Sequence, residues 1–255
     1  MKRLAVFLPD FAGGGAERSL IAIAGKVAAT GVQVAVVVAR DTGPLRGSVP
    51  ADVSIVALNA RRTATSVLQL ARFLRAWRPD AVLTGITHSN LTAIAAARLA
   101  RSPATLVVTE HTDMRAARAR PENRRSRILP ALVRRLYPRA DAVVAVSAGV
   151  ADGLASEAGI ARAAIRVIFN PVDCAAITAA AQERLTVPLG EAGVPLVAAV
   201  GRLHPDKRLD VLVRVVARIN DTSPVSLAIC GEGETRDALE PLIAALGMEH
   251  RIRLL

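Results

Sequence analysis

The clearest chemical signal in the sequence is a pair of cations in segment 201–207, which reads Gly-Arg-Leu-His-Pro-Asp-Lys. The apolar run 196–200 precedes it and a helical pattern follows, so Arg202 is expected at the carboxyl end of a strand. Pro205 suits the first helical position, which places Lys207 at the start of the next helix. A planar guanidinium and a mobile ammonium beside a helix N-terminus are suited to a diphosphate. The alternative is that both side chains are ordinary solvated cations.

The sequence also predicts that this diphosphate is bound without a metal ion. It contains no Asp-x-Asp pair, the arrangement that would hold a divalent cation against the phosphates. The charge of a departing diphosphate would therefore fall on Arg202, Lys207 and the helix end. We expect no resident cofactor at this site.

Two glycine-rich turns also follow strand patterns. Segment 13–18, Gly-Gly-Gly-Ala-Glu-Arg, comes after the apolar run 3–8 and opens a helical pattern. Free amides at a helix N-terminus attract an anion, and glycines allow it to approach. The spacing is not the dinucleotide fingerprint, because Arg18 stands where a third small residue would pack. Segment 231–234, Gly-Glu-Gly-Glu, is a weaker signal of the same kind. For both segments the alternative is a purely structural turn.

Alternating strand and helix patterns must position these segments. Such alternation is typical of β-α-β units, so we predict an α/β fold with doubly wound parallel sheets. Apolar, β-branched runs predict strands at 3–8, 32–39, 53–58, 80–86, 104–109, 142–146, 165–169, 196–200 and 225–230. Helical patterns occur at about 16–30, 66–77, 89–101, 125–137, 148–158, 207–220 and 235–247.

A polar, Ala-rich stretch interrupts this alternation after residue 173 and indicates a domain boundary. We predict one Rossmann-like domain over 1–185 and a second over 186–255. A doubly wound domain usually needs about 100 residues or more, so the second is expected to be truncated. The alternative is that something else completes its sheet.

Composition limits the function classes. Apolar residues make up 52% of the chain but aromatic residues only 2%, which suits parallel strands covered by Ala-rich helices. The net charge of +11 favours anionic partners. A nucleic-acid-binding protein is the alternative from charge alone. The scarcity of aromatic stacking side chains and the lack of a recognition motif argue against it.

The cysteines and the apolar runs point to the cytoplasm. Cys174 and Cys230 have no ligand-like spacing and are expected to be buried free thiols in a reducing compartment. The apolar run at residues 4–8 is too short for a signal peptide, and no run reaches the roughly 18 residues that span a bilayer. A soluble or peripheral cytoplasmic protein is therefore predicted.

Together these motifs resemble the retaining glycosyltransferases of family 4, which have the GT-B fold of two facing Rossmann-like domains. The resemblance runs over essentially the whole chain and is most specific at Gly201-Arg202-Leu203-x-x-x-Lys207 followed by Gly231-x-Gly233. It is also carried by Gly-Gly-Ala-Glu-Arg at 14–18, Thr-Glu-His at 109–111, Ala-Val-Ser at 145–147 and Asn-Pro-Val-Asp at 170–173.

The resemblance implies a role for each candidate residue. The two cations of segment 201–207 would hold the diphosphate of a nucleotide sugar, and Gly231 would lie near the nucleotide. Gly14 and Gly15 would line the cleft from the acceptor side. His111 would be the catalytic-site residue that faces the transferred sugar, although without the family a lone histidine is more often structural.

The implied reaction moves a sugar from a nucleoside diphosphate to a saccharide or lipid-linked acceptor, with retention, in cell-envelope or polysaccharide synthesis. The family's Glu-x7-Glu segment, which holds the ribose and the sugar hydroxyls, would lie beyond Leu255. The chain by itself is therefore expected to be incomplete for transfer, and a non-catalytic nucleotide-sugar-binding fragment is the alternative. The family's Asn-Gly-Val-Asp is here Asn-Pro-Val-Asp, in which Pro171 stiffens the approach to the linker.

A basic segment carries much of the net charge. Between Arg115 and Arg139 there are nine arginines and one acid, Glu122, and apolar residues follow helical spacing in its latter part. A basic amphipathic helix can lie on an anionic bilayer, which predicts docking at the inner face of a membrane. A solvated basic helix is the alternative.

Overall fold

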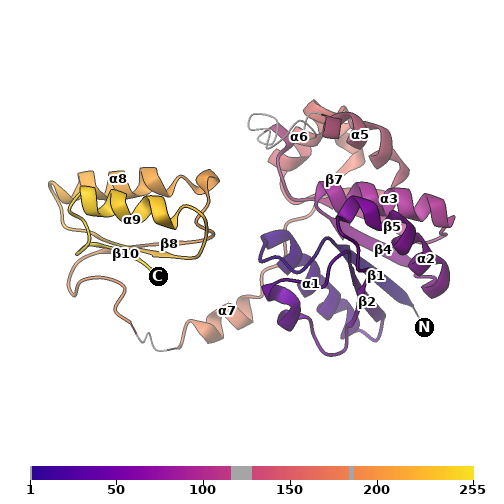
Figure 1. Cartoon of the computed structure of the whole chain (residues 1–255), viewed down its shortest axis with the longest axis horizontal. Coiled ribbons are helices and arrows are strands. Elements are labelled where there is room, and N and C mark those ends of the chain that lie inside the picture. Colours follow the sequence, from indigo (N-terminus) through magenta and orange to yellow (C-terminus); the bar gives the residue numbers. More distant parts are fainter. Residues whose placement is uncertain (1, 116–127, 184–186) are drawn as a thin grey trace. The chain divides into compact units, whose positions relative to one another are not determined.

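A computed structural model describes residues 2–115, 128–183 and 187–255. The chain forms two compact units, Met1–Val172 (unit 1) and Asp173–Leu255 (unit 2) (Figure 1). Each unit contains its own parallel sheet, which confirms the predicted α/β fold class. The boundary expected between residues 185 and 186 falls in a segment, 184–186, that is outside the described residues.

Unit 1 is built on a seven-stranded, all-parallel sheet with the order β3-β2-β1-β4-β5-β6-β7. The connections from β1 and from β4 run in opposite directions along the sheet, and such a switch point is where open α/β sheets bind ligands. The strands are β1 (Arg3–Leu8), β2 (Gln33–Val38), β3 (Ser54–Ala57), β4 (Ala81–Gly85), β5 (Thr105–Glu110), β6 (Ala142–Ala145) and β7 (Ile165–Val167).

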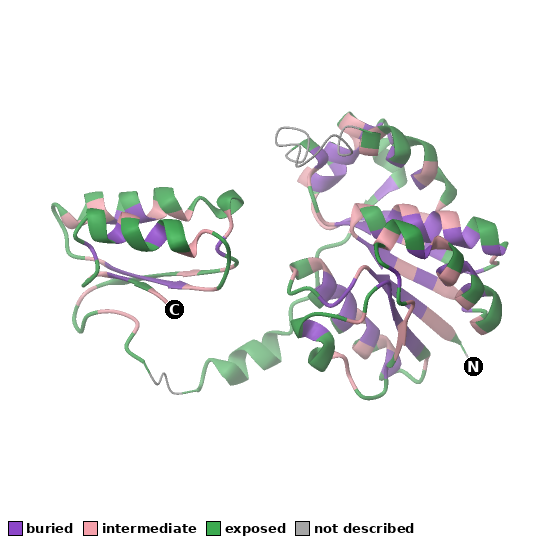
Figure 2. Ribbon diagram, in the orientation of Figure 1, coloured by how far each residue is buried: buried purple, intermediate pink, exposed green. Residues whose placement is uncertain are grey.

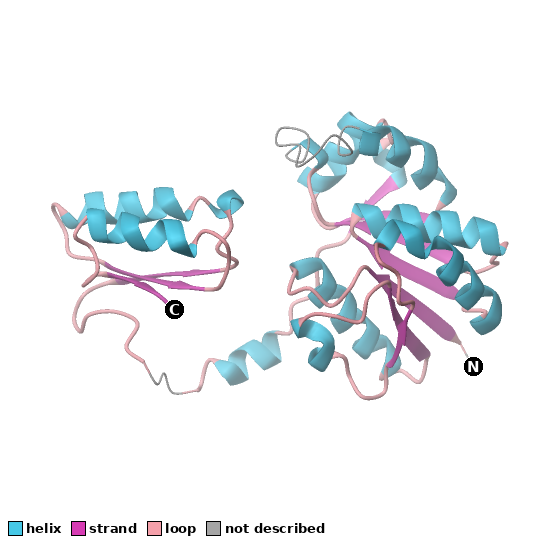
Figure 3. Cartoon of the chain, in the orientation of Figure 1, coloured by secondary structure: helices cyan, strands magenta, loops and turns pink. Residues whose placement is uncertain are grey.

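Helices connect these strands and cover the sheet (Figure 3). The α-helices of unit 1 are α1 (Gly15–Ala28), α2 (Val67–Trp77), α3 (Thr87–Ala100), α5 (Leu129–Leu136) and α6 (Ala148–Ala158). Short 3-10 helices are η1 (Pro44–Ser48), η2 (Thr63–Ser66), η4 (Tyr137–Arg139) and η5 (Arg162–Ala164).

Two hydrophobic clusters, one on each face of the sheet, hold unit 1 together. Successive side chains of a strand point to opposite faces. In β1, Val6 and Leu8 therefore pack with α1, whereas Ala5 and Phe7 pack with α2 and α3. All four are essentially inaccessible to solvent, as expected for a strand that is covered on both faces.

Unit 2 has three parallel strands in the order β10-β9-β8, with α8 and α9 on the same face (Figure 1). Its core joins Val213 and Val216 of α8, and Ile243 of α9, to Leu227 and Ile229 of β9. The elements are α7 (Cys174–Ala180), β8 (Leu196–Val200), η6 (Pro205–Lys207), α8 (Leu209–Asn220), β9 (Ser226–Cys230), α9 (Arg236–Ala245) and β10 (Ile252–Leu254).

Several predictions about unit 2 were wrong in detail. The buried strand expected at 196–200 is largely exposed, and Val200 reaches 84%, because β8 is an edge strand (Figure 2). Cys174 is exposed at the start of α7, and Cys230 is half-buried, so neither is a buried thiol, although both are free. Sequence patterns also missed α7. Asp173 caps the N-terminus of this helix, because its carboxylate accepts a hydrogen bond from the Ala176 amide at 3.0 Å.

Candidate active site

Two loops at the carboxyl edge of the unit 2 sheet are joined backbone to backbone. One follows β8 and the other follows β9. The Gly201 amide donates to the carbonyl of Cys230 at 3.0 Å, and the Leu203 amide donates to the carbonyl of Glu232 at 2.9 Å. The hydrogen-bond ladder of the sheet therefore continues into both loops. This places the segment that carries Arg202 directly against the Gly-x-Gly turn.

Glycine is required at both positions of that turn. Gly231 and Gly233 have φ angles of 156° and 153°, a conformation that side chains disfavour. A Cβ atom on Gly231 would lie 2.0 Å from the carbonyl oxygen of Gly201, and one on Gly233 would lie 2.2 Å from that of Leu203. The turn therefore has a structural purpose of its own, and the role of Gly231 near a nucleotide stays a prediction.

The two predicted cations stand exposed on the first of these loops. In the described part of the chain, neither Arg202 nor Lys207 makes a side-chain hydrogen bond or an ion pair. Neighbouring cations do: the guanidinium of Arg208 lies 3.4 Å from the carboxylate of Asp210, and that of Arg236 also pairs with acids of its own unit. Arg202 and Lys207 are thus available to an outside anion.

The position of Lys207 differs from the sequence prediction. Pro205 does open a helix, but it is the three-residue 3-10 helix η6, which Lys207 ends. Arg208 then adopts the left-handed conformation with a φ of 49°, and α8 begins only at Leu209. Lys207 is therefore separated from the first turn of α8. The turn is stabilised by His204, whose Nδ1 accepts from the Asp206 amide at 3.3 Å.

In unit 1, the first glycine turn is occupied by one of the chain's own carboxylates. Gly14 is the N-cap of α1 and Gly15 its first residue. A Cβ atom on Gly14 would lie 2.3 Å from Oε2 of Glu17, a side chain that is almost completely buried. The anion that we expected at this helix N-terminus would have to share it with Glu17, a residue that sequence reasoning did not single out.

His111 immediately follows β5, on the α1 side of the sheet. Its Nε2 lies 3.1 Å from Oγ1 of Thr109, and that hydroxyl donates to the carbonyl of Thr84 at 2.9 Å. Gly85 makes room for the ring, because a Cβ there would lie 3.2 Å from the imidazole Nε2 and 2.6 Å from Cδ1 of Leu20. Burial lowers the pKa of His111, so the ring favours its neutral form.

The alternation of β5 directs Glu110 to the opposite face, toward α3. Its carboxylate accepts from the Tyr137 hydroxyl at 2.6 Å and from the Thr87 hydroxyl at 3.0 and 3.1 Å. The nearby backbone amides of His111 and Thr112 also favour its ionised form. Burial nevertheless raises the pKa of Glu110, because desolvation outweighs these bonds. Sequence reasoning missed this group, and only the Thr-Glu-His motif could have drawn attention to it.

Backbone strain and unpaired polar atoms gather at the ends of β4 and β5. Ile86, the residue after β4, has a φ of 74°, which is rare for a β-branched residue and typical of ligand sites. Buried side-chain atoms without a hydrogen-bond partner in the described chain include Oγ1 of Thr84, Oγ of Ser89, Oδ1 of Asn90 and Nδ1 of His111.

The structure thus gathers the predicted residues in two separate groups. In unit 1, Leu20 of α1 and the ring of His111 both lie against Gly85, so the helix that Gly14 and Gly15 open is a neighbour of the histidine. In unit 2, the loop that carries Arg202 and Lys207 is bonded to the Gly231 turn. Gly85 was not predicted, although a glycine at the end of a strand is a signal that could have found it.

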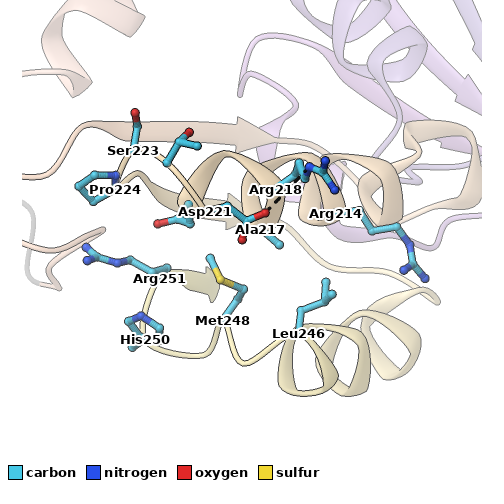
Figure 4. Close-up of a pocket in the computed structure, with 12 residues that line it drawn as sticks. Arg214, Ala217, Arg218, Asp221, Ser223, Pro224, Leu246, Met248, His250 and Arg251 are labelled. Carbon is cyan, nitrogen blue, oxygen red and sulfur yellow. Dashed lines mark ion pairs between the residues drawn. The ribbon is translucent and has the colours of Figure 1, made fainter.

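A hollow of about 570 Å³ lies at the amino ends of the unit 2 strands, opposite the two loops, and none of the predicted residues lines it (Figure 4). It is formed where α8, α9 and the start of β9 meet. The arginines around it point away from one another in Figure 4, and two of them are already paired, Arg218 with Asp221 and Arg251 with Glu191. These cations therefore do not converge on an anion.

In residues 2–115, 128–183 and 187–255, no group of three or more His, Cys, Asp or Glu residues is arranged to hold a metal ion. Nor does any helix in them combine the length and apolar character needed to cross a membrane.

Known structures share this fold. HepE of Anabaena, in complex with UDP and glucose, matches with a TM-score of 0.74 at 20% identity, covering 100% of this chain and 69% of that one. The apo form of the lipopolysaccharide outer core galactosyltransferase WaaB matches with a TM-score of 0.66 at 19% identity, covering 99% and 67%. Two parallel α/β units with this likeness define the class of fold, which is the GT-B fold.

The family follows from the sequence comparisons. The family model described as Glycosyltransferase Family 4 matches residues 13–176, more than half of the chain, and the one described as Glycosyl transferases group 1 matches residues 183–255. The chain belongs to Glycosyltransferase Family 4, which confirms the resemblance.

Two curated relatives agree with this assignment. The N-acetylgalactosamine-N,N'-diacetylbacillosaminyl-diphospho-undecaprenol 4-alpha-N-acetylgalactosaminyltransferase of Campylobacter jejuni is 30% identical over 124 residues, which are 49% of this chain. The lipopolysaccharide core biosynthesis glycosyltransferase LpsE of Rhizobium meliloti is 32% identical over 117 residues, or 46% of this chain. Each match spans only 32% of the relative's length.

Proposed function

We propose that the protein transfers a sugar from a nucleoside diphosphate to a saccharide or lipid-linked acceptor, in cell-envelope or polysaccharide synthesis. Family membership supports glycosyl transfer. The two curated relatives act, by their names, on a diphospho-undecaprenol-linked sugar and in lipopolysaccharide core biosynthesis. HepE, which has the same fold, was solved with UDP and with UDP-glucose, which supports a uridine nucleotide as the leaving group.

In the proposed mechanism, Arg202 and Lys207 bind the diphosphate and stabilise its charge as the glycosidic bond breaks. The backbone of the loop that carries them is already bonded to the Gly231 turn, which reduces the rearrangement that binding requires. Preorganised charges of this kind usually supply the largest part of catalysis. Transfer is proposed to proceed with retention through an oxocarbenium-like transition state. Because these two cations balance the charge, the proposed reaction is independent of a metal ion.

Unit 1 is proposed to align the sugar and the acceptor. His111 faces the transferred sugar, and its neutral ring offers hydrogen bonding without adding a charge. Gly14 and Gly15 line the acceptor side of the site, where their lack of side chains allows close approach. Alignment of this kind accounts for much of the rate enhancement in group transfer.

The observation that carries this proposal is the pair of unpartnered cations on a fixed loop. We expect UDP to bind, as measured by isothermal titration calorimetry. Arg202→Gln and Lys207→Gln should each weaken binding about tenfold or more, because each removes a charged hydrogen bond that contributes about 1.5–3 kcal/mol. Arg218→Gln is the matched control, since it removes the same charge from the far end of α8.

The control separates a specific site from general attraction by the basic protein. If both glutamine variants bound UDP as tightly as Arg218→Gln does, the diphosphate site would be wrong. The anomeric configuration of the product, read by NMR against that of the donor, tests retention separately. Product with the inverted anomer would refute that part of the proposal alone.

We also propose that the basic segment from Arg115 to Arg139 docks the protein on the inner, anionic face of a membrane. Residues 116–127 lie outside the described part. In the described remainder, Ile128, the N-cap of α5, and Leu132 and Arg135 within α5 are exposed at helical spacing. Flotation should recover the protein with vesicles that contain phosphatidylglycerol and not with pure phosphatidylcholine. Equal, negligible recovery with both would refute this docking.

A further inference from the structure

The proposed reaction does not use one buried network of polar side chains in unit 1. Four side chains, which we call the Glu110 clasp, form this network: Thr87, Asn90, Glu110 and Tyr137. Glu110 is 1% exposed and Tyr137 is fully buried. The Asn90 amide donates to the Tyr137 hydroxyl at 2.9 Å and to the Thr109 carbonyl at 2.8 Å. The clasp therefore ties α3 and η4 to the end of β5.

We propose that Glu110 is a positioning residue for His111, and that the Glu110 clasp fixes the imidazole as a single neutral tautomer with its proton on Nε2. The clasp holds the chain at the base of the ring, because the Asn90 amide donates to the backbone carbonyl of Thr109 at 2.8 Å and the Thr109 hydroxyl contacts the ring. Glu110 directly precedes His111 in the chain, and its carboxylate is held by two hydroxyls from other elements, those of Thr87 and Tyr137. The proposal rests on the proposed function, in which His111 faces the sugar.

The tautomer follows from the hydrogen bonds of Thr109. A hydroxyl has one proton, and that of Thr109 is donated to the carbonyl of Thr84 at 2.9 Å. Toward the imidazole, 3.1 Å away, the same oxygen must therefore act as acceptor, so Nε2 of His111 carries the hydrogen. Nδ1 is left as a bare acceptor and is buried without a partner in the described chain.

This assignment determines what His111 offers a ligand. An unprotonated Nδ1 accepts a hydrogen bond from a hydroxyl and cannot donate one to a carbonyl or a phosphate oxygen. The clasp thereby limits a partner of Nδ1 to a hydroxyl donor, which must displace the groups that bury this atom. A histidine without the clasp would exchange between its two neutral tautomers and would lose that selectivity.

The test reads the tautomer directly, in this chain and without any transfer assay. The four histidines are labelled with nitrogen-15, and the His111 ring is assigned by its loss in His111→Gln. In the wild-type chain we expect one pyrrole-like signal from Nε2 and one pyridine-like signal from Nδ1. In Glu110→Gln and Tyr137→Phe both signals should shift toward their average, because both tautomers become populated.

Thr92→Val is the matched control, since Thr92 is also a buried hydroxyl of α3 but bonds to the carbonyls of His88 and Thr63. Its His111 signals should equal those of the wild type. If circular dichroism shows that Glu110→Gln does not fold, the His111 signals of Tyr137→Phe decide the test. This variant removes only one oxygen atom and so disturbs the core less. Wild-type-like signals in the folded clasp variants, or a wild-type ring protonated on Nδ1, would overturn the proposal. Failure of the wild-type chain to bind UDP would instead refute the diphosphate site and would leave the tautomer assignment standing.

Discussion

Replacement of Gly231 by alanine would test the backbone contact that joins the two loops of the proposed diphosphate site. The new methyl group would lie 2.0 Å from the carbonyl oxygen of Gly201. Carbon and oxygen atoms in close contact are normally about 3.3–3.6 Å apart, so the loops must separate by more than an ångström. A shift of that size would break the hydrogen bonds that the amides of Gly201 and Leu203 make at 3.0 and 2.9 Å.

The expected cost can be worked out from these contacts. Two lost hydrogen bonds cost about 1–3 kcal/mol, at about 0.5–1.5 kcal/mol each. Alanine at a φ of 156° adds about 1–3 kcal/mol of backbone strain. Gly201→Ala is a matched control, because Gly201 has a φ of 157° but nothing within 4 Å of its Cβ position. Gly231→Ala should therefore destabilise unit 2 by about 1–3 kcal/mol more than Gly201→Ala does.

Hydrogen exchange of the β8 and β9 amides would measure the free energy of opening of unit 2 in both variants. Trp77 is the single tryptophan and lies in unit 1, so its fluorescence during urea unfolding should be unchanged. Equal losses in the two variants would show that the contact with Gly201 carries no energy. A change in the Trp77 transition would show that the effect is not confined to unit 2.

Three further predictions concern both units. Burial raises the pKa of Glu110 in the folded chain. Protonated Glu110 therefore adds to the free energy of unfolding below pH of about 4.3, the pKa of an ordinary Glu, and this contribution is lost as the pH rises through the pKa of the folded chain. Glu110→Gln should remove that loss of stability with rising pH, as measured by urea unfolding at several pH values. If the free energy of unfolding depended on pH in the same way in both chains, the prediction would be contradicted. Gly85→Ala should displace the His111 ring, because its Cβ would lie 2.7 Å from Oγ1 of Thr109, and unchanged ring signals in NMR spectra would count against this packing. EDTA should leave the affinity for UDP unchanged, and a loss that magnesium restores would show that a metal assists binding.

Much of the fold was predictable from the sequence because its signals are local. Buried parallel strands read as continuous apolar runs, and all nine predicted strands are present within a few residues of their expected ends. The Arg202 and Lys207 motif was recognised because its chemistry lies within one short segment. The same local reasoning placed Lys207 on α8, because nothing in the sequence indicates the left-handed conformation of Arg208.

Contacts between distant residues were outside the reach of that reasoning. The exposure of β8 depends on which strands lie beside it, and the start of α1 on how Glu17 folds back over Gly14. The Glu110 clasp is the clearest case. Tyr137 is 27 residues from Glu110 and Thr87 is 23 residues from it, and neither carries a motif of its own.

The sequence by itself thus determined the α/β class and the family and predicted the two cations of the proposed diphosphate site, since periodicity and residue chemistry are properties of short segments. The tertiary structure alone decided which loops touch, which glycines are indispensable and which side chains hold His111. Those features arise when strands that are far apart in the chain become neighbours in one sheet, and a linear pattern does not specify that pairing.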